Sequence, residues 1–301
     1  MKQKPIYVEL PIRASLEDVW KATQDPTRHQ AWDLRFSSIT YLPKEKGEPQ
    51  SFLYKTNIGF GLSIAGWGES VGSHQSKEGS KTSSLRFGTD QKLSLIREGR
   101  GYWKYTQQDE HTKFLTQYDY DVRYGFVGRV VDGLIFRPMI GWATALSFDV
   151  LKRSLEKGES SQSQYLRFFI SVLMVAFFSF VWLYHGLVPK LLVQHPEEVM
   201  MIQRTLGLNQ DLASLVVQFV GIAELMMAGL WVLYRKKRQL FLIQCVLFPM
   251  LTISSIIAAP HLLNAPFNPI TFNGALFVLS VVGFYCSKDL PTARSCTRRR
   301  I

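Results

Sequence analysis

One stretch decides how this chain is organised: residues 165–192 read YLRFFISVLMVAFFSFVWLYHGLVPKLL. The 20 residues at 168–187 contain no carboxylate, lysine or arginine. At about 1.5 Å per residue, a helix of that length spans about 30 Å, the thickness of a bilayer's hydrocarbon core. Trp182 and Tyr184 lie near the end of the stretch and are typical of the aromatic belt at a membrane surface. The sequence therefore predicts a first membrane span at about 166–187.

Three more apolar stretches follow, and each is long enough to cross a membrane. They predict spans at about 212–234, 240–260 and 270–287, so residues 165–287 form an all-α bundle of four transmembrane helices. A basic tail at 288–301 ends the chain. Four crossings place both ends of this bundle on the same side of the membrane.

The distribution of lysine and arginine predicts which side that is. The segments expected on one side carry 13 basic residues: four around the start of the first span, the RKKR turn at 235–238, and five in the tail. The other side carries only Lys190 and Arg204. Because basic residues accumulate on the cytoplasmic side, we expect a multi-pass protein of the cell membrane with the N-terminal half and the C-terminus in the cytoplasm.

The first half of the chain has a different composition. Residues 1–160 carry 23 Lys and Arg against 19 Asp and Glu, scattered as on a soluble surface, whereas residues 161–301 carry 12 against 5. The excess positive charge therefore lies beside apolar spans, where it suits anionic lipid headgroups better than nucleic acid, and no basic recognition element appears. The three cysteines all lie beyond residue 240, so we expect free thiols, and no leader peptide is apparent at the N-terminus.

Alternation of apolar and polar residues predicts a curved antiparallel sheet in residues 1–158. A strand at 6–12 precedes two short helices at about 16–32, and six strand-like runs follow between 35 and 124. The glycines between Gly59 and Gly68 are expected to form a hairpin or bulges, since no Lys-Ser/Thr pair follows them as in a phosphate loop. A long helical pattern runs from 126 to 157, with a kink at Pro138. A polar linker, ESSQSQ, at 159–164 joins this domain to the first span.

This order of elements, together with FRPMIGWATALSFDVLKRSLEKG at 136–158, resembles the START-like helix-grip superfamily, also called SRPBCC or polyketide-cyclase-like. The resemblance covers about residues 1–158. It implies an α+β domain in which the sheet wraps around the last helix and encloses an apolar cavity. The residues that we expect to line this cavity are Trp32, Phe114, Tyr118, Tyr120, Trp142 and Leu146.

No catalytic motif was found in this half, which leaves open whether the protein is an enzyme. His29, His74 and His111 have no metal-ligand spacing, so we expect surface or turn histidines and no metal site. Asp119 and Asp121 share one strand face opposite the aromatic residues, so we expect them to face water rather than to act as an acid/base pair.

In the membrane half, Glu224 is the one carboxylate within a predicted span. A carboxylate facing lipid costs about 2.5 kcal/mol or more, so Glu224 should face the bundle interior, on the same helix face as Gly221 and Ala228. Both a functional role and a structural hydrogen bond between helices remain open. His185 and Lys190 are open between function and the headgroup interface. The complete set of membrane-domain candidates is Glu224, His185, Lys190, Tyr184, Asn268 and Asn273.

Four segments of this half are similar to the DoxX-like family of four-helix membrane proteins: VWLYHGLVPKLL at 181–192, HPEE at 195–198, GIAEL at 221–225 and APFNPITFNGAL at 265–276. Some members of that family are associated with quinone-linked oxidation complexes. By this analogy quinone is a cofactor to consider, although the sequence contains no haem, iron–sulfur or dinucleotide motif.

Three functions follow as hypotheses. The first is a membrane protein whose cytoplasmic domain binds an apolar small molecule, lipid or isoprenoid in kind, and presents it to the four-helix domain. The second is a quinone-linked membrane oxidoreductase component, and the third is a membrane scaffold without chemistry of its own. Expected partners are the bilayer, the apolar ligand, and either a membrane protein or a second copy of this chain.

Overall fold

A computed structural model of the protein describes residues 3–45, 47–76, 79–266 and 268–300. The chain divides into two compact units. The sheet unit contains Met1–Tyr165 together with Pro291–Ile301, and the helical unit contains Leu166–Leu290. The predicted division between an N-terminal domain and an apolar helical half is thus observed, but the C-terminal segment belongs to the sheet unit.

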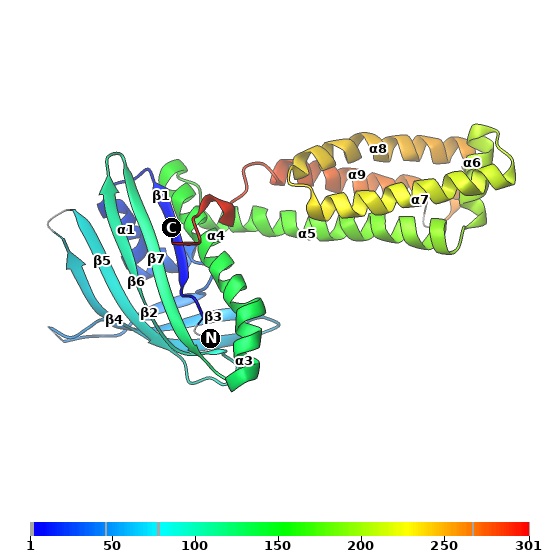
Figure 1. Cartoon of the computed structure of the whole chain (residues 1–301). Helices are drawn as coiled ribbons and strands as arrows, with labels where there is room; N and C mark the ends of the chain where they lie inside the picture. The colour runs from blue at the N-terminus through cyan, green and yellow to red at the C-terminus, as the bar shows by residue number, and fades with distance from the viewer. Residues whose placement is uncertain (1–2, 46, 77–78, 267, 301) are drawn as a thin grey trace. The chain divides into compact units, whose positions relative to one another are not determined.

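The described residues of the sheet unit form one antiparallel sheet of seven strands, in the order β1-β7-β6-β5-β4-β3-β2 (Figure 1). Neighbours in the sheet are neighbours in sequence except for β1, which pairs with β7, with Ile6 opposite Tyr118 and Ile12 opposite Thr112. Most strands lie within a few residues of the positions predicted from the alternation of apolar and polar residues. The strands are β1 (Ile6–Ile12), β2 (Ser38–Tyr41), β3 (Ser51–Gly59), β4 (Leu62–Gln75), β5 (Ser80–Gly88), β6 (Ile96–Gln108) and β7 (His111–Val122).

Two short helices and one long helix pack on the inner face of the sheet, defined as the face that carries Phe114. Helix α1 (Leu16–Gln24) begins at Ser15, whose side chain accepts a hydrogen bond from the Asp18 amide. Helix α2 (Pro26–Trp32) begins at Asp25, which caps the Arg28 amide, and Pro26 occupies its first turn. Helix α4 (Arg137–Lys157) stacks Phe148 on Phe114 of β7, with ring centroids 4.4 Å apart. The helix-grip arrangement expected from the sequence is therefore present.

The closing helix is interrupted where the sequence predicted a kink. Helix α3 (Gly125–Val131) continues into a π-helical segment, η1 (Asp132–Phe136), and Pro138 lies in the first turn of α4. Proline lacks an amide hydrogen, so it fits best where a regular helix restarts. Buried Asp132 anchors the segment by accepting hydrogen bonds from Tyr120 Oη (2.6 Å) and Arg137 Nε (3.0 Å).

The C-terminal segment completes the sheet unit rather than extending from it as a tail. Thr297 exchanges two backbone hydrogen bonds with Glu9, of 2.9 and 3.0 Å, on the open edge of β1. The Thr292 amide donates to Asp149 (2.9 Å), and Ala293 is buried. Covering an edge strand in this way removes unpaired backbone groups that could otherwise pair with another chain.

The helical unit contains four long apolar helices that lie lengthwise beside one another (Figure 1). They are α5 (Ser161–His185), α7 (Gln210–Leu233), α8 (Lys237–Ala258) and α9 (Pro269–Cys286). A π-helical segment, η2 (Gly186–Leu192), extends α5, and α6 (Pro196–Leu206) and the 3₁₀ turn η3 (Pro260–Asn264) complete the unit. The HPEE motif starts α6, because His195 caps the helix, Pro196 opens it and the two glutamates occupy its first turn.

Five helical segments within the described residues are long and apolar enough to cross a membrane, one more than predicted. The fifth is the continuous segment Gly125–Lys157 of the sheet unit, in which half of the apolar window is buried, against 17–28% in the other four. That burial identifies it as the closing helix of the sheet. The other four leave most of their apolar surface uncovered, which suits lipid rather than water.

The predicted linker at 159–164 is not an extended connection. Ser161–Gln164 form the first turn of α5, and Gln164 is fully buried in the sheet unit. Its Nε2 donates to the Val150 carbonyl (3.3 Å) and to Ser154 Oγ (3.2 Å). Serine and glutamine have adequate helix propensity, so the local composition did not forbid the helix, and the tertiary contacts of Gln164 stabilise it.

A buried amide joins all four long helices of the helical unit. In the orientation that satisfies its neighbours, the Gln244 side-chain oxygen accepts hydrogen bonds from the indole nitrogens of Trp182 (2.7 Å) and Trp231 (3.3 Å). The other end of this amide lies 3.3 Å from Ser280 Oγ. These residues come from α8, α5, α7 and α9 respectively, so one polar group fixes the register of four apolar helices.

Candidate functional site

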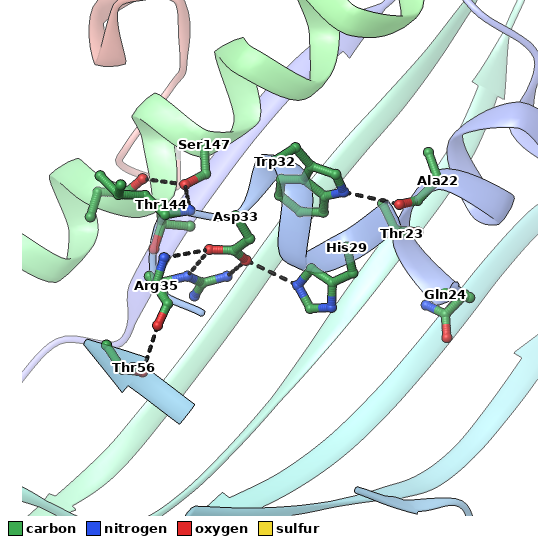
Figure 2. Close-up of polar contacts among 12 residues, drawn as sticks. Ala22, Thr23, Gln24, His29, Trp32, Asp33, Arg35, Thr56, Thr144 and Ser147 are labelled. Carbon is green, nitrogen blue, oxygen red and sulfur yellow. Dashed lines mark hydrogen bonds and ion pairs between the residues drawn. The ribbon is translucent and has the colours of Figure 1, made fainter. Parts of the chain in front are cut away.

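The first candidate site lies where α2 ends and the chain turns into β2. His29 and Asp33 are one helical turn apart, and Asp33 forms the C-cap of α2. Arg35 follows two residues later, so its guanidinium folds back onto Asp33 (Figure 2). We refer to His29, Asp33 and Arg35 as the Asp33 cluster.

The Asp33 carboxylate is fully buried and accepts four hydrogen bonds. Arg35 donates from Nη2 (2.6 Å), Nε (2.9 Å) and its backbone amide (3.1 Å), and His29 donates from Nε2 (3.0 Å). An ionised carboxylate can only accept, so the proton of His29 lies on Nε2. The His29 ring stacks on Trp32 at 5.0 Å and meets Trp103 edge-on at 5.0 Å. Figure 2 shows the side chains of His29 and Arg35 on either side of the Asp33 carboxylate.

The electrostatics of the cluster favour its charged form. Burial raises the pKa of Asp33, but the positive charge and hydrogen bonds of Arg35, with the hydrogen bond from His29, outweigh burial and hold this pKa well below its usual range. Burial likewise lowers the pKa of Arg35, and the Asp33 carboxylate more than reverses this effect. Both groups are therefore charged at neutral pH, inside a domain core.

Arg35 marks a boundary on the inner face of the sheet. On one side, Trp32, Trp103, Tyr105, Phe114 and Phe148 are buried against one another. On the other side, Phe36, Phe52, Tyr54 and Phe87 remain partly exposed, and we call these four residues the aromatic wall. The Arg35 guanidinium lies over the rings of Phe36 and Tyr118, 5.5 Å from each centroid.

Glycines on β4 allow the wall to lie flat on the sheet. A Cβ atom at Gly66 would lie 2.4 Å from the Tyr54 ring, and one at Gly68 would lie 2.2 Å from the Phe52 ring. The glycine-rich stretch thus has two roles: Gly59 and Gly61 form the β3–β4 turn with positive φ, and Gly66 and Gly68 accommodate aromatic side chains. The sequence predicted the first role and missed the second.

The predicted cavity residues do not lie together on one open surface. Trp32, Phe114, Tyr118, Tyr120 and Leu146 are buried, and their rings and methyl groups form the packed part of the core. Trp142 is 37% exposed and lies instead on a groove at the edge of the sheet unit. The partly exposed aromatic surface consists of residues that the sequence did not single out.

The expectation for His29 was wrong, because the ring is part of the buried aromatic cluster rather than of the surface. The spacing His-x-x-x-Asp-x-Arg was the available signal, since residues four apart share a helix face. Asp119 and Asp121 do lie on the outer face, where each pairs with an arginine: Arg137 at 2.9 Å and Arg97 at 3.1 Å. Among the described residues, no group of three or more His, Cys, Asp or Glu side chains could hold a metal ion.

The first turn of α5 reaches the same cluster. Tyr165, the last residue of the sheet unit, donates its hydroxyl to the Trp32 carbonyl (2.5 Å). Ser147 of α4 accepts from the Leu34 amide (2.9 Å) and lies 3.3 Å from the same tyrosine hydroxyl. The backbone on both sides of Asp33 is thus held by α4 and by the start of the helix that enters the helical unit.

The second candidate site is an ion cluster in the helical unit. Lys190 Nζ lies 3.2 Å from Glu224 Oε2 and 3.2 Å from Glu198 Oε1. The Lys190 side chain is 9% exposed and that of Glu224 is 13% exposed, so this contact is mostly buried. The residues come from η2, α7 and α6, and the cluster thus gathers two of the sequence motifs, HPEE and GIAEL, around the lysine of a third.

Two glycines make this close approach of helices geometrically feasible. A Cβ atom at Gly186 would lie 2.6 Å from the Gly221 carbonyl oxygen, and one at Gly221 would lie 2.9 Å from the Gly186 carbonyl oxygen. Small residues at a membrane helix interface permit this separation. The sequence predicted that Gly221 and Glu224 share the face toward a neighbouring helix, and it is this face that meets η2.

The remaining membrane candidates lie outside the ion cluster. Asn268 caps α9 by accepting from the Thr271 amide (3.0 Å), which is a structural task, and Asn273 is partly buried on α9. Tyr184 is 50% exposed. His185 packs against Phe272 at 5.4 Å. Glu198 completes the cluster and was missed, since nothing in the sequence pairs a residue of α6 with Lys190.

Comparison with known proteins identifies the class. Residues 179–281 match the model of the DoxX-like family. Membrane protein YndG of Bacillus subtilis (strain 168) is 49% identical over 187 residues, which make up 62% of this chain and 70% of the relative. The chain therefore belongs to the DoxX-like family and is a membrane protein.

Solved structures are similar to the sheet unit at low identity. A STAR-related lipid transfer protein fragment from Xanthomonas axonopodis is 14% identical, with 50% of this chain and 85% of that chain covered and a TM-score of 0.40. The ZhuI aromatase/cyclase from Streptomyces sp. R1128 is 10% identical, with 52% and 98% covered and a TM-score of 0.39.

Proposed function

We propose that the sheet unit binds an apolar molecule with one polar end, lipid or isoprenoid in kind, and presents it to the helical unit. The observation that carries this proposal is the aromatic wall, which remains partly exposed on the inner face of the sheet beside Arg35, whose side chain is 14% exposed. An apolar surface with a single charged group at its border suits a ligand with an apolar body and an acceptor-bearing end.

Arg35 is the residue that would receive the polar end. Its side-chain hydrogen bonds to Asp33 use Nε and Nη2, and a guanidinium has five N–H donors in all. Asp33 and His29 keep the guanidinium in place, so binding does not have to order a free side chain. The hydrogen bond from Tyr165 to the Trp32 carbonyl supplies a physical link from this cluster to α5.

Photo-crosslinking tests the location of the ligand. The full-length protein, extracted in detergent, is illuminated with a phospholipid or a polyprenyl analogue that carries a diazirine in its apolar chain, and labelled peptides are mapped. We expect labels on the inner face of β3, β4 and β5. Ile64 is partly exposed on that face, and Ile64→Trp should reduce the labelling at least fivefold by filling the space. Leu53→Trp, on the outer face of the adjacent strand, is the matched control. Equal labelling of both variants, or labels confined to the helical unit, would contradict the proposal.

A second function rests on a separate observation, the Lys190–Glu224–Glu198 cluster. A buried lysine between two carboxylates can hold or transfer a proton, which suits a membrane component that handles a quinone. The same experiment with an azidoquinone distinguishes this function, because labels would then fall on η2, α6 or α7.

We also propose that the sheet unit and the C-terminal segment are cytoplasmic. Residues on both sides of the helical unit, 165 and 291, belong to the same folded unit, so the chain between them crosses the membrane an even number of times. The distribution of 13 basic residues against two supports the cytoplasmic side.

A further inference from the structure

The edge of the sheet unit contains a basic groove of about 900 Å³ that none of the proposed functions uses. The start of β1 forms one wall, and the start of α4 forms another. The C-terminal segment forms the third. Five cationic side chains and no carboxylate line it: Lys4, Arg137, Arg294, Arg298 and Arg299.

Most of this charge is not neutralised within the protein. Arg137 pairs with Asp119 and Asp132, but no ion pair joins Lys4, Arg294, Arg298 or Arg299 to any residue in the described part of the chain. The other ionisable lining groups add no negative charge. Burial raises the pKa of the Cys296 thiol to about 12, and burial with the hydrogen bond to Glu9 raises the pKa of Tyr7 to about 12. The groove is therefore strongly positive at neutral pH.

The groove is held in shape by the fold. Thr297 pairs with Glu9 through two backbone hydrogen bonds, and Cys296 Sγ lies 3.3 Å from the Ala145 carbonyl oxygen. Buried Pro291 and Ala293 fix the residues that precede these contacts. The arginines thus project from an ordered segment, in which Arg294 belongs to the 3₁₀ turn Ala293–Ser295 and Arg298 follows the bridge at Thr297, so less conformational entropy is lost when they bind an anion.

We propose that this groove binds the phosphate group of an anionic ligand. Several arginines around one concave site match phosphate, whose oxygens accept paired hydrogen bonds from a guanidinium. Trp142, with Ile6 and Pro138, gives the groove an apolar side as well, which suits a glycerol or acyl portion next to the phosphate. Arg294 comes only eight residues after α9 ends at Cys286, so the segment that carries the arginines directly follows a proposed membrane span in the sequence. An anionic lipid headgroup and a soluble phosphate ester share this chemistry.

The test uses the full-length protein in neutral detergent and measures hydrogen exchange of residues 3–9 and 291–300. The probes are dioctanoyl phosphatidic acid, dioctanoyl phosphatidylcholine, glycerol 3-phosphate and a 20-nucleotide RNA. We expect protection by phosphatidic acid at a concentration at least tenfold lower than by phosphatidylcholine. Protection by phosphatidic acid alone assigns a lipid headgroup, and equal protection by glycerol 3-phosphate assigns a soluble ester; both support the proposal.

Variants locate the site. In Arg294→Gln/Arg298→Gln/Arg299→Gln, the half-saturating concentration should rise at least tenfold. Lys44→Gln/Lys55→Gln/Lys104→Gln removes three exposed cations outside the groove and should behave as the wild type. The single variant Arg298→Glu should also weaken binding, and unchanged exchange at Glu9 without ligand shows that the segment remains docked. Equal losses in both triple variants, equal binding of phosphatidylcholine, or tighter binding of RNA at 150 mM salt would overturn the proposal. None of these outcomes depends on a ligand at the aromatic wall.

Discussion

Replacing Arg35 with methionine tests the physical account of the Asp33 cluster. The substitution preserves most of the apolar stem but removes the charge and two side-chain hydrogen bonds, of 2.6 and 2.9 Å, from a carboxylate with no solvent exposure. Removing one partner of a buried ion pair costs about 3–5 kcal/mol, because the remaining charge is buried without compensation. We expect Arg35→Met to lower the free energy of unfolding of the sheet unit by about this amount at pH 7.

The double variant Asp33→Asn/Arg35→Met identifies the origin of that cost. Asparagine keeps an acceptor for the Arg35 amide and for His29 but carries no charge, so the double variant should be more stable than Arg35→Met alone by about 1–3 kcal/mol. Hydrogen exchange of peptides within 26–41, in the full-length protein in detergent, measures each opening free energy. Arg86→Met, which breaks the exposed pair with Glu98, is the matched control and should stay close to the wild type. Equal opening free energies in Arg35→Met and Arg86→Met would contradict a stabilising buried ion pair between Arg35 and Asp33.

The stabilisation by Asp33 should also depend on pH. Folding depresses the pKa of Asp33, so its stabilisation is complete above the unfolded-state pKa of about 3.9 and is lost as the pH falls below that value. The stability difference between the wild type and Asp33→Asn should therefore shrink below about pH 4. A difference that is independent of pH between 7 and 3 would contradict an ionised Asp33.

Three more predictions concern the helical unit and the orientation of the chain in the membrane. Gly186→Ala should lower the stability of the helical unit by about 1–3 kcal/mol, because the new methyl group meets a backbone carbonyl. Gly229→Ala, where a Cβ atom would meet nothing within 4 Å, should be neutral or slightly stabilising. Thermal unfolding in detergent compares the two variants. Glu224→Gln should express and fold but lose quinone or lipid binding if the ion cluster is functional, and equal binding by the wild type and Glu224→Leu would exclude that role. A single cysteine at Asn264 should react with an impermeant maleimide in intact cells and one at Ser73 only after lysis; labelling of Ser73 without lysis would contradict a cytoplasmic sheet unit.

Periodic features were readable from the sequence because they follow local rules. The alternation in β7 predicted a shared face for Phe114, Thr116, Tyr118, Tyr120, Val122 and Tyr124. The first four are buried, whereas Val122 is partly buried and Tyr124, beyond the end of the strand, is 58% exposed. Long apolar runs predicted the four long helices of the helical unit to within about five residues at each end. Pro138 likewise marked the interruption of the closing helix, since proline limits where a regular helix can restart.

The missed features depend on contacts between distant residues. The aromatic wall draws on β3, β5 and the segment after α2, so no window of sequence contains its pattern. The C-terminal segment reads as a basic tail, and only the free edge of β1 explains why Thr297 docks there. Glu198 joins Lys190 because α6 folds back onto η2, a turn that the local sequence does not specify.

Native mass spectrometry of the full-length protein, released from its own membranes in mild detergent, tests whether the sheet unit binds an apolar molecule. We expect one co-purified apolar molecule per chain in the wild type and in Leu53→Trp, and its loss in Ile64→Trp. A wild-type protein that carries no such molecule, or an Ile64→Trp variant that retains it fully, would contradict a ligand site on the inner face of the sheet.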